Sequence, residues 1–473
     1  MRIEVTSMWL SREDCERIHE SALQVLEEVG VRIDDPEIVR LLVDAGGVEA
    51  GGDRVRIPRH VVSQALSQCP RSVSTADRSG KLTELGPRRG TLFLTGNALY
   101  VTRGHARAEL ESADLAELAR VVEACKNIDG MVGTSIADTA PQCRDFVGFR
   151  IMAENTRKHL RPCIYTPRGA KLVMEMAAVL LDGASLRARP IVSTGFSILS
   201  PLHWSALALG VFRETAGLGV PVMINSEPLA GATAPVTLAG CLVIGDADVM
   251  SGLVINQLLE PGRPCFYNIG FAHVIDMASA IALTGSPENA LLQAAGADLA
   301  HYHGLPCASW MSTEAMTADE QAAFEKMMMG MAHVLAGANF IWGAGNLEST
   351  LAMSPEALVT DDEIAGYCLR LQKSFEVEER TLALDLIRSA ALSGDFLTAG
   401  HTLENYREVL SRPLLASRSR REEWLSRGGL TFGEAARERV REILDRPEEP
   451  CIDAMQLAEL RRIETYGMRT LAG

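Results

Sequence analysis

The residues best suited to chemistry lie where short apolar runs of the chain end. The run at residues 338–342 leads directly into a glycine-rich loop that carries Asn346 and Glu348. Other runs also end in aromatic, amide or acidic side chains, at the last residue or a few residues later: Tyr165, Asn225, Glu227, Tyr267, Phe271, Trp310, Trp342 and His401. A quaternary ammonium ion has no N–H to donate, and aromatic faces stabilise it by ~0.5 to 2 kcal/mol for each cation–π contact. The pattern therefore indicates a site for such an ion.

We assign two roles to these side chains. Trp310, Trp342 and Tyr267 are expected to form a box around the cation. Asn346, Glu348 and His401 are expected to orient the substrate as catalytic polar groups. The remaining candidates for substrate binding are Tyr165, Asn225, Glu227 and Phe271. Packing in the core is the alternative for each aromatic residue, and a solvated surface position is the alternative for the two glutamates.

Two other polar groups are weaker candidates. Arg103, His105 and Arg107 could gate the site or bind a substrate carboxylate, but a solvated loop is the simpler interpretation. His301 and His303 fall at the end of an expected helix, on the side away from the chemistry, so we interpret them as structural. No other histidine or cysteine pair has the spacing of metal ligands, and we expect no metal site.

Strand-like apolar runs alternate with helical patterns along most of the chain. The runs lie at residues 131–136, 162–166, 190–196, 221–225, 264–269, 306–310 and 338–342, with an eighth expected at 396–399. Their separation is roughly 30 to 40 residues, the length of one βα unit. Eight units predict an α/β fold of the (β/α)8 TIM-barrel type, whereas an open doubly wound sheet often begins with a GxGxxG turn that this sequence lacks. Barrel active sites lie at the C-terminal ends of the strands, where the candidate residues fall.

Three segments are expected in all. Residues 1–110 begin with a capping-box-like start at Ser11 and Asp14, followed by a helical pattern and short apolar alternations, and are expected to form a helical and hairpin cap. Residues 111–402 are expected to form the catalytic barrel. The charge-rich residues 403–473 are expected to form a helical extension that wraps the barrel or serves an oligomer interface.

Composition excludes several classes of partner. The 473 residues carry a formal net charge of −15, which argues against nucleic acid or an anionic membrane as the main partner. The N-terminus acquires charges before an apolar run forms, and no 18-residue stretch is apolar and free of charge, so we expect a cytoplasmic protein without a membrane span. The ten cysteines include no CxxC pair, which indicates small core residues rather than disulfides.

Six short motifs together resemble the trimethylamine methyltransferase family. They are PVTLAG at 235–240, QLLEPGRP at 257–264, LAGANFIWGAG at 335–345, DEIAG at 362–366, DFLTAGHT at 395–402 and WLSRG at 424–428. Each motif alone is weak, but their order is that of the family and covers the chain from near Ser11 to past Trp424. Founding members carry pyrrolysine close to the loop after residue 342, whereas this chain has only the twenty ordinary residues.

The resemblance implies methyl transfer from a methylated amine to the cobalt of a separate corrinoid protein. Without pyrrolysine it implies a quaternary amine similar to glycine betaine as the substrate, no tightly bound cofactor, a corrinoid protein as partner, and a homo-oligomer. Direct attack of Co(I) on the methyl group then needs no general acid, because the amine leaves neutral. Two alternatives remain open: a barrel that binds methylated amines without turnover, and a barrel lyase that uses Glu227 or Glu348 as a base.

Overall fold

A computed structural model of the chain describes residues 7–51, 53–392 and 394–471. At its centre lie eight parallel strands, which we call the strand ring. Each strand pairs with two others, directly or through an isolated bridge, in the order β6, β9, β10, β11, β13, β15, β18, β19 and back to β6. Their bounds are β6 (Leu92–Thr95), β9 (Gly130–Val132), β10 (His159–Arg161), β11 (Thr194–Ser197), β13 (Val222–Asn225), β15 (Cys265–Asn268), β18 (Ala308–Trp310) and β19 (Phe340–Ala344).

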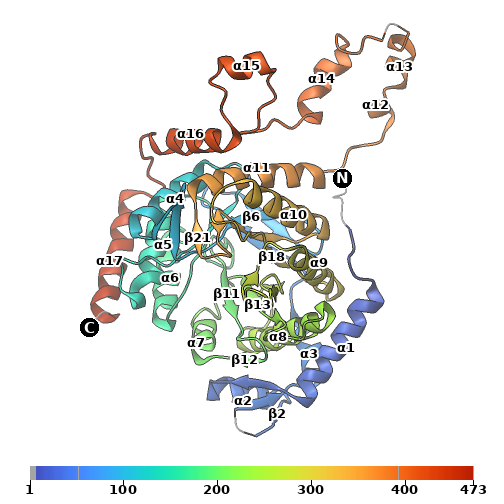
Figure 1. The fold of residues 1–473 in the computed structure, drawn as a ribbon. Coiled ribbons are helices and arrows are strands. Elements are labelled where there is room, and N and C mark those ends of the chain that lie inside the picture. The colour runs from blue at the N-terminus through green and yellow to red at the C-terminus, as the bar shows by residue number, and fades with distance from the viewer. Residues whose placement is uncertain (1–6, 52, 393, 472–473) are drawn as a thin grey trace.

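Helices surround the strand ring and alternate with its strands along the chain (Figure 1). They are α4 (Ser112–Ala124), α5 (Arg144–Asn155), α6 (Pro167–Val179), α7 (Ala206–Glu214), α8 (Leu238–Leu259), α9 (Pro287–Tyr302), α10 (Glu320–Ala336) and α11 (Pro355–Gln372), with a short 3-10 helix, Pro141–Cys143, before α5. The expected mixture of helices and strands in βα alternation is therefore present.

Two expected strands are wrong, and one ring strand was not expected. Residues 162–166 follow β10 rather than form it, because Pro162 has no N–H to continue the ladder. Residues 396–399 form no strand: the carboxylate of Asp395 accepts from the backbone N–H groups of Leu397 and Thr398, which bends the chain into a turn before α14. The strand ring instead begins with β6, inside the segment expected to be a cap. The division into 1–110, 111–402 and 403–473 stays a prediction.

The N-terminal elements pack against the outside of the strand ring. Helix α1 (Arg12–Glu28) contacts α8 and α9, and α3 (Arg59–Gln68) contacts α8. Between them lie β1 (Val31–Ile33), α2 (Pro36–Asp44), β2 (Val48–Glu49) and β3 (Arg54–Arg56). The hairpin of β4 (Val73–Ala76) and β5 (Leu82–Leu85) follows, and its Val73 and Leu85 join the apolar cluster inside the ring. This hairpin therefore extends the inner core of the ring.

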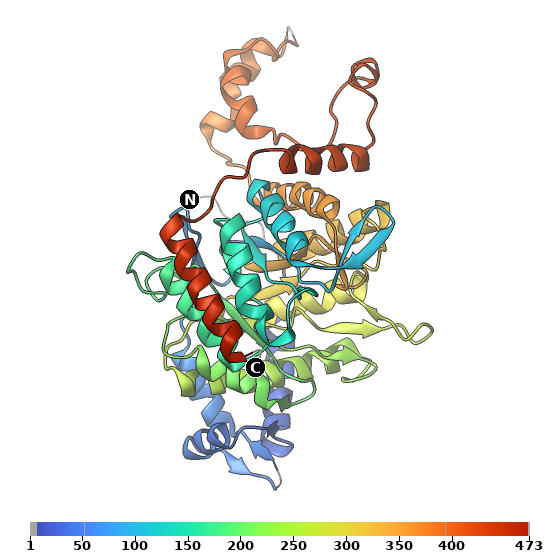
Figure 2. The ribbon, with the colours of Figure 1, turned by 90° about the vertical axis from the view of Figure 1, so that its left-hand side faces the viewer.

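Small sheets form in the loops that follow the ring strands. One contains β7 (Tyr100–Arg103), β8 (Ala106–Glu109), β20 (Asn346–Leu347) and β21 (Ala352–Met353). Another contains β14 (Leu229–Ala230), β16 (His273–Ile275) and β17 (Ala282–Leu283), while β12 (His203–Trp204) pairs with β1. Figure 2 shows the β7–β8 and β16–β17 hairpins projecting from the same side of the molecule. We call this C-terminal end of the ring strands the ring mouth.

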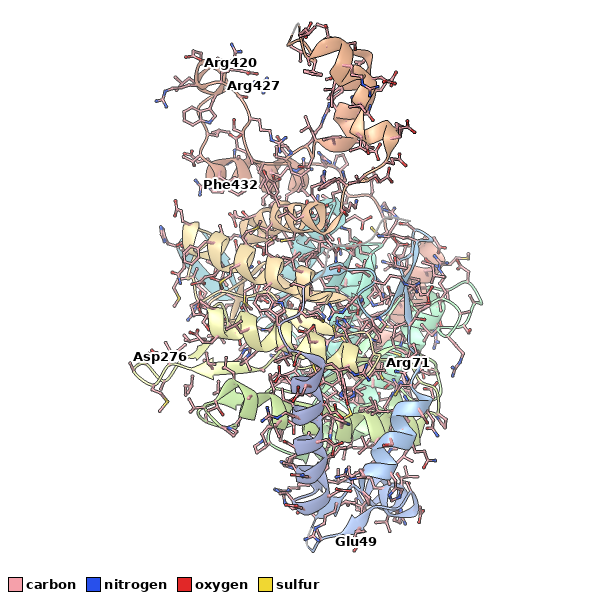
Figure 3. The ribbon with its side chains drawn as sticks, turned by 90° about the vertical axis from the view of Figure 1, so that its right-hand side faces the viewer. Glu49, Arg71, Asp276, Arg420, Arg427 and Phe432 are labelled. Carbon is pink, nitrogen blue, oxygen red and sulfur yellow. The ribbon has the colours of Figure 1, made fainter. Side chains whose placement is uncertain are left out.

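The C-terminal part of the chain is divided between an arm and two packed helices. The arm contains α12 (Glu379–Leu382), α13 (Leu384–Ala390), α14 (Gly400–Val409) and α15 (Arg421–Ser426), and it extends away from the body (Figures 1 and 3). Its large apolar side chains are exposed, including Leu392, Leu397 and Leu403. Helix α16 (Phe432–Leu444) then packs on α11 and α4, and α17 (Ala454–Leu471) packs on α6 and α5.

Local sequence signals explain several helix boundaries. The capping box expected at Ser11 and Asp14 is present at the start of α1. Ser286 and Ser354 cap α9 and α11 through their side-chain oxygens, each with proline at the first helical position. Within the described residues, α8 is the one helix long and apolar enough to cross a membrane, yet 72% of its most apolar window is buried inside the molecule. It is an interior helix of the fold.

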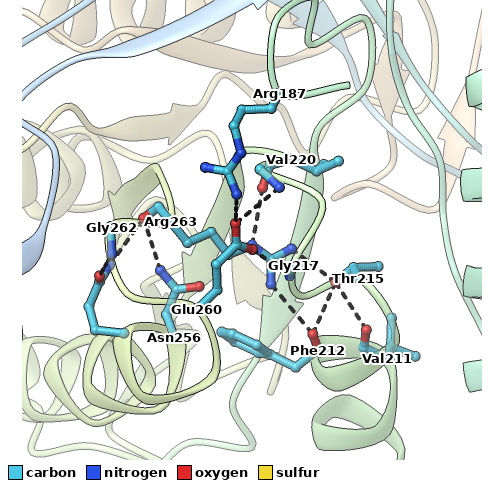
Figure 4. A network of polar contacts seen from close by, with 12 residues as sticks. Arg187, Val211, Phe212, Thr215, Gly217, Val220, Asn256, Glu260, Gly262 and Arg263 are labelled. Atoms are coloured by element: carbon cyan, nitrogen blue, oxygen red, sulfur yellow. Dashed lines mark hydrogen bonds and ion pairs between the residues drawn. The ribbon is translucent and has the colours of Figure 1, made fainter. Parts of the chain in front are cut away.

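The QLLEPGRP motif forms a buried polar network at the end of α8 (Figure 4). Arg263 is fully buried, and burial lowers the pKa of its guanidinium to about 10. Its Nε donates to the carbonyl of Val220 at 3.1 Å, and a terminal nitrogen donates to the Thr215 hydroxyl at 3.0 Å. Glu260 accepts from Arg187 and from the backbone of Gly217. The motif is therefore structural and fixes the segment that leads into β13.

We expect Arg263→Lys to lower the free energy of unfolding by ~1–3 kcal/mol. Lysine keeps the charge but cannot reach both the Val220 carbonyl and the Thr215 hydroxyl, and a buried group left without its hydrogen bond costs that much. Urea unfolding followed by circular dichroism measures the change. Arg187→Lys, on the more exposed side of the same network, is the control and should lower the free energy of unfolding by less. Equal losses in the two variants would contradict this account of Arg263.

Candidate functional site

Side chains of the ring strands alternate between the inside and the outside of the ring, as β-strands require. On β15, Phe266 belongs to the apolar cluster inside the ring, whereas Tyr267 belongs to the cluster between strands and helices. On β19, Phe340 and Trp342 lie inside and Ile341 outside. This alternation decides which candidates can meet at the ring mouth.

Three aromatic candidates meet inside the mouth. Trp310 and Trp342 are paired in register on β18 and β19, and their ring centroids are 5.7 Å apart. Phe271, in the loop after β15, lies 4.6 Å from Trp310 and 5.1 Å from Trp342. Both tryptophans are buried and Phe271 is partly buried. The structure thus brings together the aromatic group that we predicted, with Phe271 in the place expected for Tyr267.

Arg161 completes this group, although the sequence analysis did not single it out. Its guanidinium carbon lies 3.7 Å from the centroid of the Trp342 ring, and the side chain is 7% exposed. The guanidinium also lies close to β11: a Cβ built on Gly195 would be 2.0 Å from a terminal nitrogen of Arg161. Glycine at position 195 is therefore what allows the guanidinium to lie across the ring.

A row of polar side chains crosses the mouth on three neighbouring strands. Ser197, Asn225 and Asn268 occupy matching positions on β11, β13 and β15. Asn268 Nδ2 donates to Asn225 Oδ1 at 2.8 Å, and Asn268 Oδ1 accepts from the backbone N–H of Gly270 at 2.7 Å. Asn225 was a predicted contact and is 2% exposed. Because its amide is fixed by neighbours, it can orient a ligand without reorganising.

Glu227 and Tyr165 lie at the rim of the mouth. Glu227 is open to solvent, yet enough protein surrounds its carboxyl that burial raises its pKa, with Ser197 and the charge of Arg161 opposing the rise. Burial also raises the pKa of Tyr165, which lies beside Cys163 and Ser135. Glu227 therefore faces the same region as Arg161, and Tyr165 lies beside Cys163, whose thiol is influenced by the charge of Arg161.

Asn346 and Glu348 lie farther along the loop after β19. Asn346 is buried, donates to the carbonyl of Asn97 at 2.8 Å and leaves its Oδ1 without a partner. It sits against β6, since a Cβ on Gly96 would be 1.4 Å from that Oδ1. Glu348 has a positive φ of 53° and forms an ion pair of 2.6 Å with Arg107 of the β7–β8 hairpin. Its contacts are thus with the hairpin rather than with the aromatic group.

A buried ion pair that the sequence pattern did not predict holds the glycine-rich loop from the helix side. Lys326 Nζ on α10 lies 2.5 Å from Asp361 Oδ2 on α11, and both side chains are 1% exposed. Lys326 also donates to the Gly343 carbonyl at 3.2 Å, and Asp361 accepts from the Gly345 N–H at 2.6 Å. The loop between Trp342 and Asn346 is therefore fixed by two helices.

Two predicted residues lie elsewhere. Tyr267 points outward from β15, and its hydroxyl donates to Asp246 Oδ1 at 2.7 Å. His401 is on α14, in the arm, because the residues before it form a turn instead of the expected last strand. Tyr267 therefore cannot join the aromatic group in this structure, and His401 does not reach the mouth of its own chain.

Asp246 also joins two histidines in a buried cluster. His19 Nδ1 lies 2.8 Å from one of its oxygens, and His303 Nε2 lies 3.2 Å from the other. Although burial alone would raise it, the pKa of Asp246 is held well below its usual range by His303 and His19. The three groups could hold a metal ion by geometry, but they already satisfy one another by hydrogen bonds. The structural role expected for His303 agrees with these contacts.

His19 makes the packing of α1 depend on pH. Burial opposes its protonation, but the hydrogen bond and charge of Asp246 outweigh burial and raise the pKa of His19. A histidine pKa that is higher in the folded state stabilises the protein below the unfolded value of ~6.5, and this stabilisation disappears as the pH rises through the folded value. We expect the free energy of unfolding to fall as the pH rises above ~6.5, and to fall less in His19→Gln. Identical pH profiles in urea unfolding would contradict the prediction.

Comparisons with known proteins give matches over nearly the whole chain. The family model of trimethylamine methyltransferase matches residues 2–466. A trimethylamine methyltransferase of Desulfitobacterium hafniense is 31% identical over 444 residues, which cover 92% of this chain and 89% of that protein. A glycine betaine methyltransferase of the same species is 30% identical over 453 residues, which cover 94% of each.

A solved structure shows the same fold. The monomethylamine methyltransferase of Methanosarcina barkeri superposes with a TM-score of 0.55 at 12% identity, covering 93% of this chain and 90% of that one. Two of the sequence motifs noted above, QLLEPGRP at 257–264 and LAGANFIWGAG at 335–345, lie in the α8 network and at β19. Since the family match spans nearly the whole sequence, the chain belongs to the trimethylamine methyltransferase family.

Proposed function

We propose that this protein transfers a methyl group from a quaternary amine to the Co(I) of a corrinoid carried by a separate protein. The observation that carries the proposal is the group of Trp310, Trp342 and Phe271 inside the mouth, with a carboxylate, Glu227, at the rim. Aromatic faces and one negative charge suit a cation that cannot donate a hydrogen bond. The glycine betaine methyltransferase among the relatives supports this class of substrate.

The residues of this chain have a positioning role in the proposal. The rings of Phe271 and Trp310 hold the ammonium group, Glu227 balances its charge, and the Asn225–Asn268 pair limits how the substrate can turn. The corrinoid supplies Co(I) as the nucleophile, and the neutral tertiary amine that leaves needs no acid. Holding one methyl group in line with the mouth is then the main contribution of the protein. The roles proposed for Asn346 and Glu348 are to fix the loop and the β7–β8 hairpin beside the mouth.

Several features of the assembly complete the proposal. The strand ring is a (β/α)8 barrel whose mouth admits the corrinoid protein, and this chain has no tightly bound cofactor of its own. The protein is cytoplasmic.

The protein forms a homo-oligomer, in which a second copy covers the apolar side chains of the arm and could bring His401 to a mouth. Light scattering of the full chain and of a variant with Leu397→Ser and Leu403→Ser would test this; an unchanged mass would oppose an oligomer held by the arm.

A second function is favoured by one observation. Burial raises the pKa of Glu227, as is common for a carboxylate that acts as a general base. A lyase using this base would show a bell-shaped dependence of rate on pH, which methyl transfer to Co(I) does not require. Glu348 is less suited to this role because its carboxylate is paired with Arg107.

Binding is tested by thermal unfolding with glycine betaine, proline betaine, carnitine, choline and trimethylamine. A ligand present at 100 times its dissociation constant stabilises the native state by ~2.7 kcal/mol. We expect at least one quaternary amine to raise the melting temperature, and trimethylamine to have no effect. Stabilisation by trimethylamine alone, or by none of the five compounds, would oppose the proposed substrate class.

A further inference from the structure

Arg161 is a buried cation without a partner. Its Nε has no hydrogen-bond partner, and no hydrogen bond or ion pair of its terminal nitrogens is found within residues 7–51, 53–392 and 394–471. The indole N–H of Trp342, the ring on which the guanidinium lies, is also buried and unpaired. A buried charge left unpaired is costly, so its presence indicates a missing anionic acceptor.

The neighbouring groups do not supply that acceptor. Glu227 influences Arg161 through its charge but lies beyond ion-pair distance. Burial raises the pKa of the Cys163 thiol, so this group stays neutral at physiological pH. The two arginines of the β7–β8 hairpin differ from Arg161, since Arg107 pairs with Glu348 and Arg103 pairs with Asp114 and Glu117.

We infer that Arg161 binds a carboxylate of the substrate, which makes the substrate a zwitterion with a quaternary ammonium group at one end and a carboxylate at the other. The inference rests on the proposed function and narrows its substrate class. A guanidinium presents its N–H groups in one plane and matches a carboxylate with two parallel hydrogen bonds. Here the ring of Trp342 covers the guanidinium, and the absence of a side chain at Gly195 leaves room for one of its terminal nitrogens.

The rest of the mouth suits the opposite end of such a zwitterion. Because Arg161 occupies one face of Trp342, the ammonium group is directed to Phe271 and Trp310. Glu227 supplies the negative charge for that end. The arrangement of one unpaired positive and one negative group across the mouth complements a betaine, whereas a simple ammonium ion would leave Arg161 unpaired.

Isothermal titration with four probes separates the two ends of the ligand. Glycine betaine carries both charges; choline carries the ammonium group alone; 3,3-dimethylbutyrate replaces the nitrogen of glycine betaine with carbon and carries the carboxylate alone; 3,3-dimethylbutanol carries neither. The proteins are the wild type, Arg161→Met and Gly195→Ala, whose added methyl group displaces the guanidinium while keeping its charge. Arg103→Met, an exposed arginine already paired at the hairpin, is the matched control.

We expect the wild type to bind glycine betaine at least ~30-fold more tightly than choline, which corresponds to the loss of one buried charge pair. Arg161→Met and Gly195→Ala should lose this preference and also lose binding of 3,3-dimethylbutyrate, while Arg103→Met should keep both. If choline binds the wild type as tightly as glycine betaine, the carboxylate site is refuted while the proposed function stands. If 3,3-dimethylbutyrate binds through Arg161 but no ammonium compound binds, the carboxylate site stands and the proposed function fails.

Discussion

Lys326→Met is expected to lower the free energy of unfolding by ~3–5 kcal/mol, because it leaves Asp361 as a buried charge without its partner. Both side chains of the wild-type pair are 1% exposed, so water cannot replace the lost ammonium group. The Gly343 carbonyl loses its donor in the same change. Urea unfolding with a common m-value for wild type and variant measures the effect.

Two further variants make this result specific. Lys326→Met combined with Asp361→Leu removes both charges, and apolar replacements of a buried pair are often close to neutral, so the double variant should regain much of the loss. Lys373→Met removes an exposed lysine just after α11 and should change the stability little. A single variant that loses less than ~1 kcal/mol would show that the pair does not hold the glycine-rich loop, since such a loss is typical of exposed ion pairs.

Trp342→Ala is expected to reduce the rate of methyl transfer by ~100-fold or more, as is typical when a substrate is displaced by about 1 Å. The indole supports the Arg161 guanidinium at 3.7 Å and packs against Trp310 and Phe271. Without the indole, the Arg161 guanidinium and the rings of Trp310 and Phe271 lose the side chain against which they pack, and the loop that leads to Asn346 loses the same support. The rate is measured per folded molecule, with saturating glycine betaine and reduced corrinoid protein.

The matched control is Trp204→Ala. Trp204 is equally buried, but it lies outside the strand ring, where its Nε1 donates to Ser251 Oγ and its ring packs against Phe212. Removing either tryptophan should lower the stability by ~3–5 kcal/mol. Trp204→Ala should nevertheless retain its rate per folded molecule. If Trp342→Ala also retains its rate and substrate affinity, the aromatic group is not the binding site.

Much of the strand order could be predicted because proline marks where several strands begin. Pro221, Pro264 and Pro306 precede β13, β15 and β18, at positions where a missing N–H costs little. The same signal was misleading at Pro162, which follows β10 instead of preceding it. The predicted strand therefore began just after Arg161, whereas Arg161 is in fact the last residue of β10. For this reason the sequence pattern did not indicate that Arg161 lies at the ring mouth.

Other errors have physical causes that the sequence does not show. The position expected for Tyr267 was wrong, because an apolar run does not show which of its residues face into the ring. On β15 the residues that face inward are Phe266 and Asn268. β6 was missed because its four residues are adjacent to turns and resemble a hairpin strand. Lys326 and Asp361 lie on two helices and become partners only in the packed structure. Trp310 and Asn225 end β18 and β13, Trp342 lies within β19 and Phe271 lies in the loop after β15, so all four are near the ring mouth as expected, and their role in binding stays a prediction.

The central claim is tested most directly by methyl transfer itself. The purified protein is mixed anaerobically with glycine betaine and a reduced corrinoid protein, and the absorbance change from Co(I) to methyl-Co(III) is followed together with the amount of dimethylglycine formed. We predict one dimethylglycine for each methyl-cobalt, with no product from trimethylamine. Tight binding of glycine betaine without any methyl-cobalt would contradict the account and favour a protein that binds methylated amines without turnover.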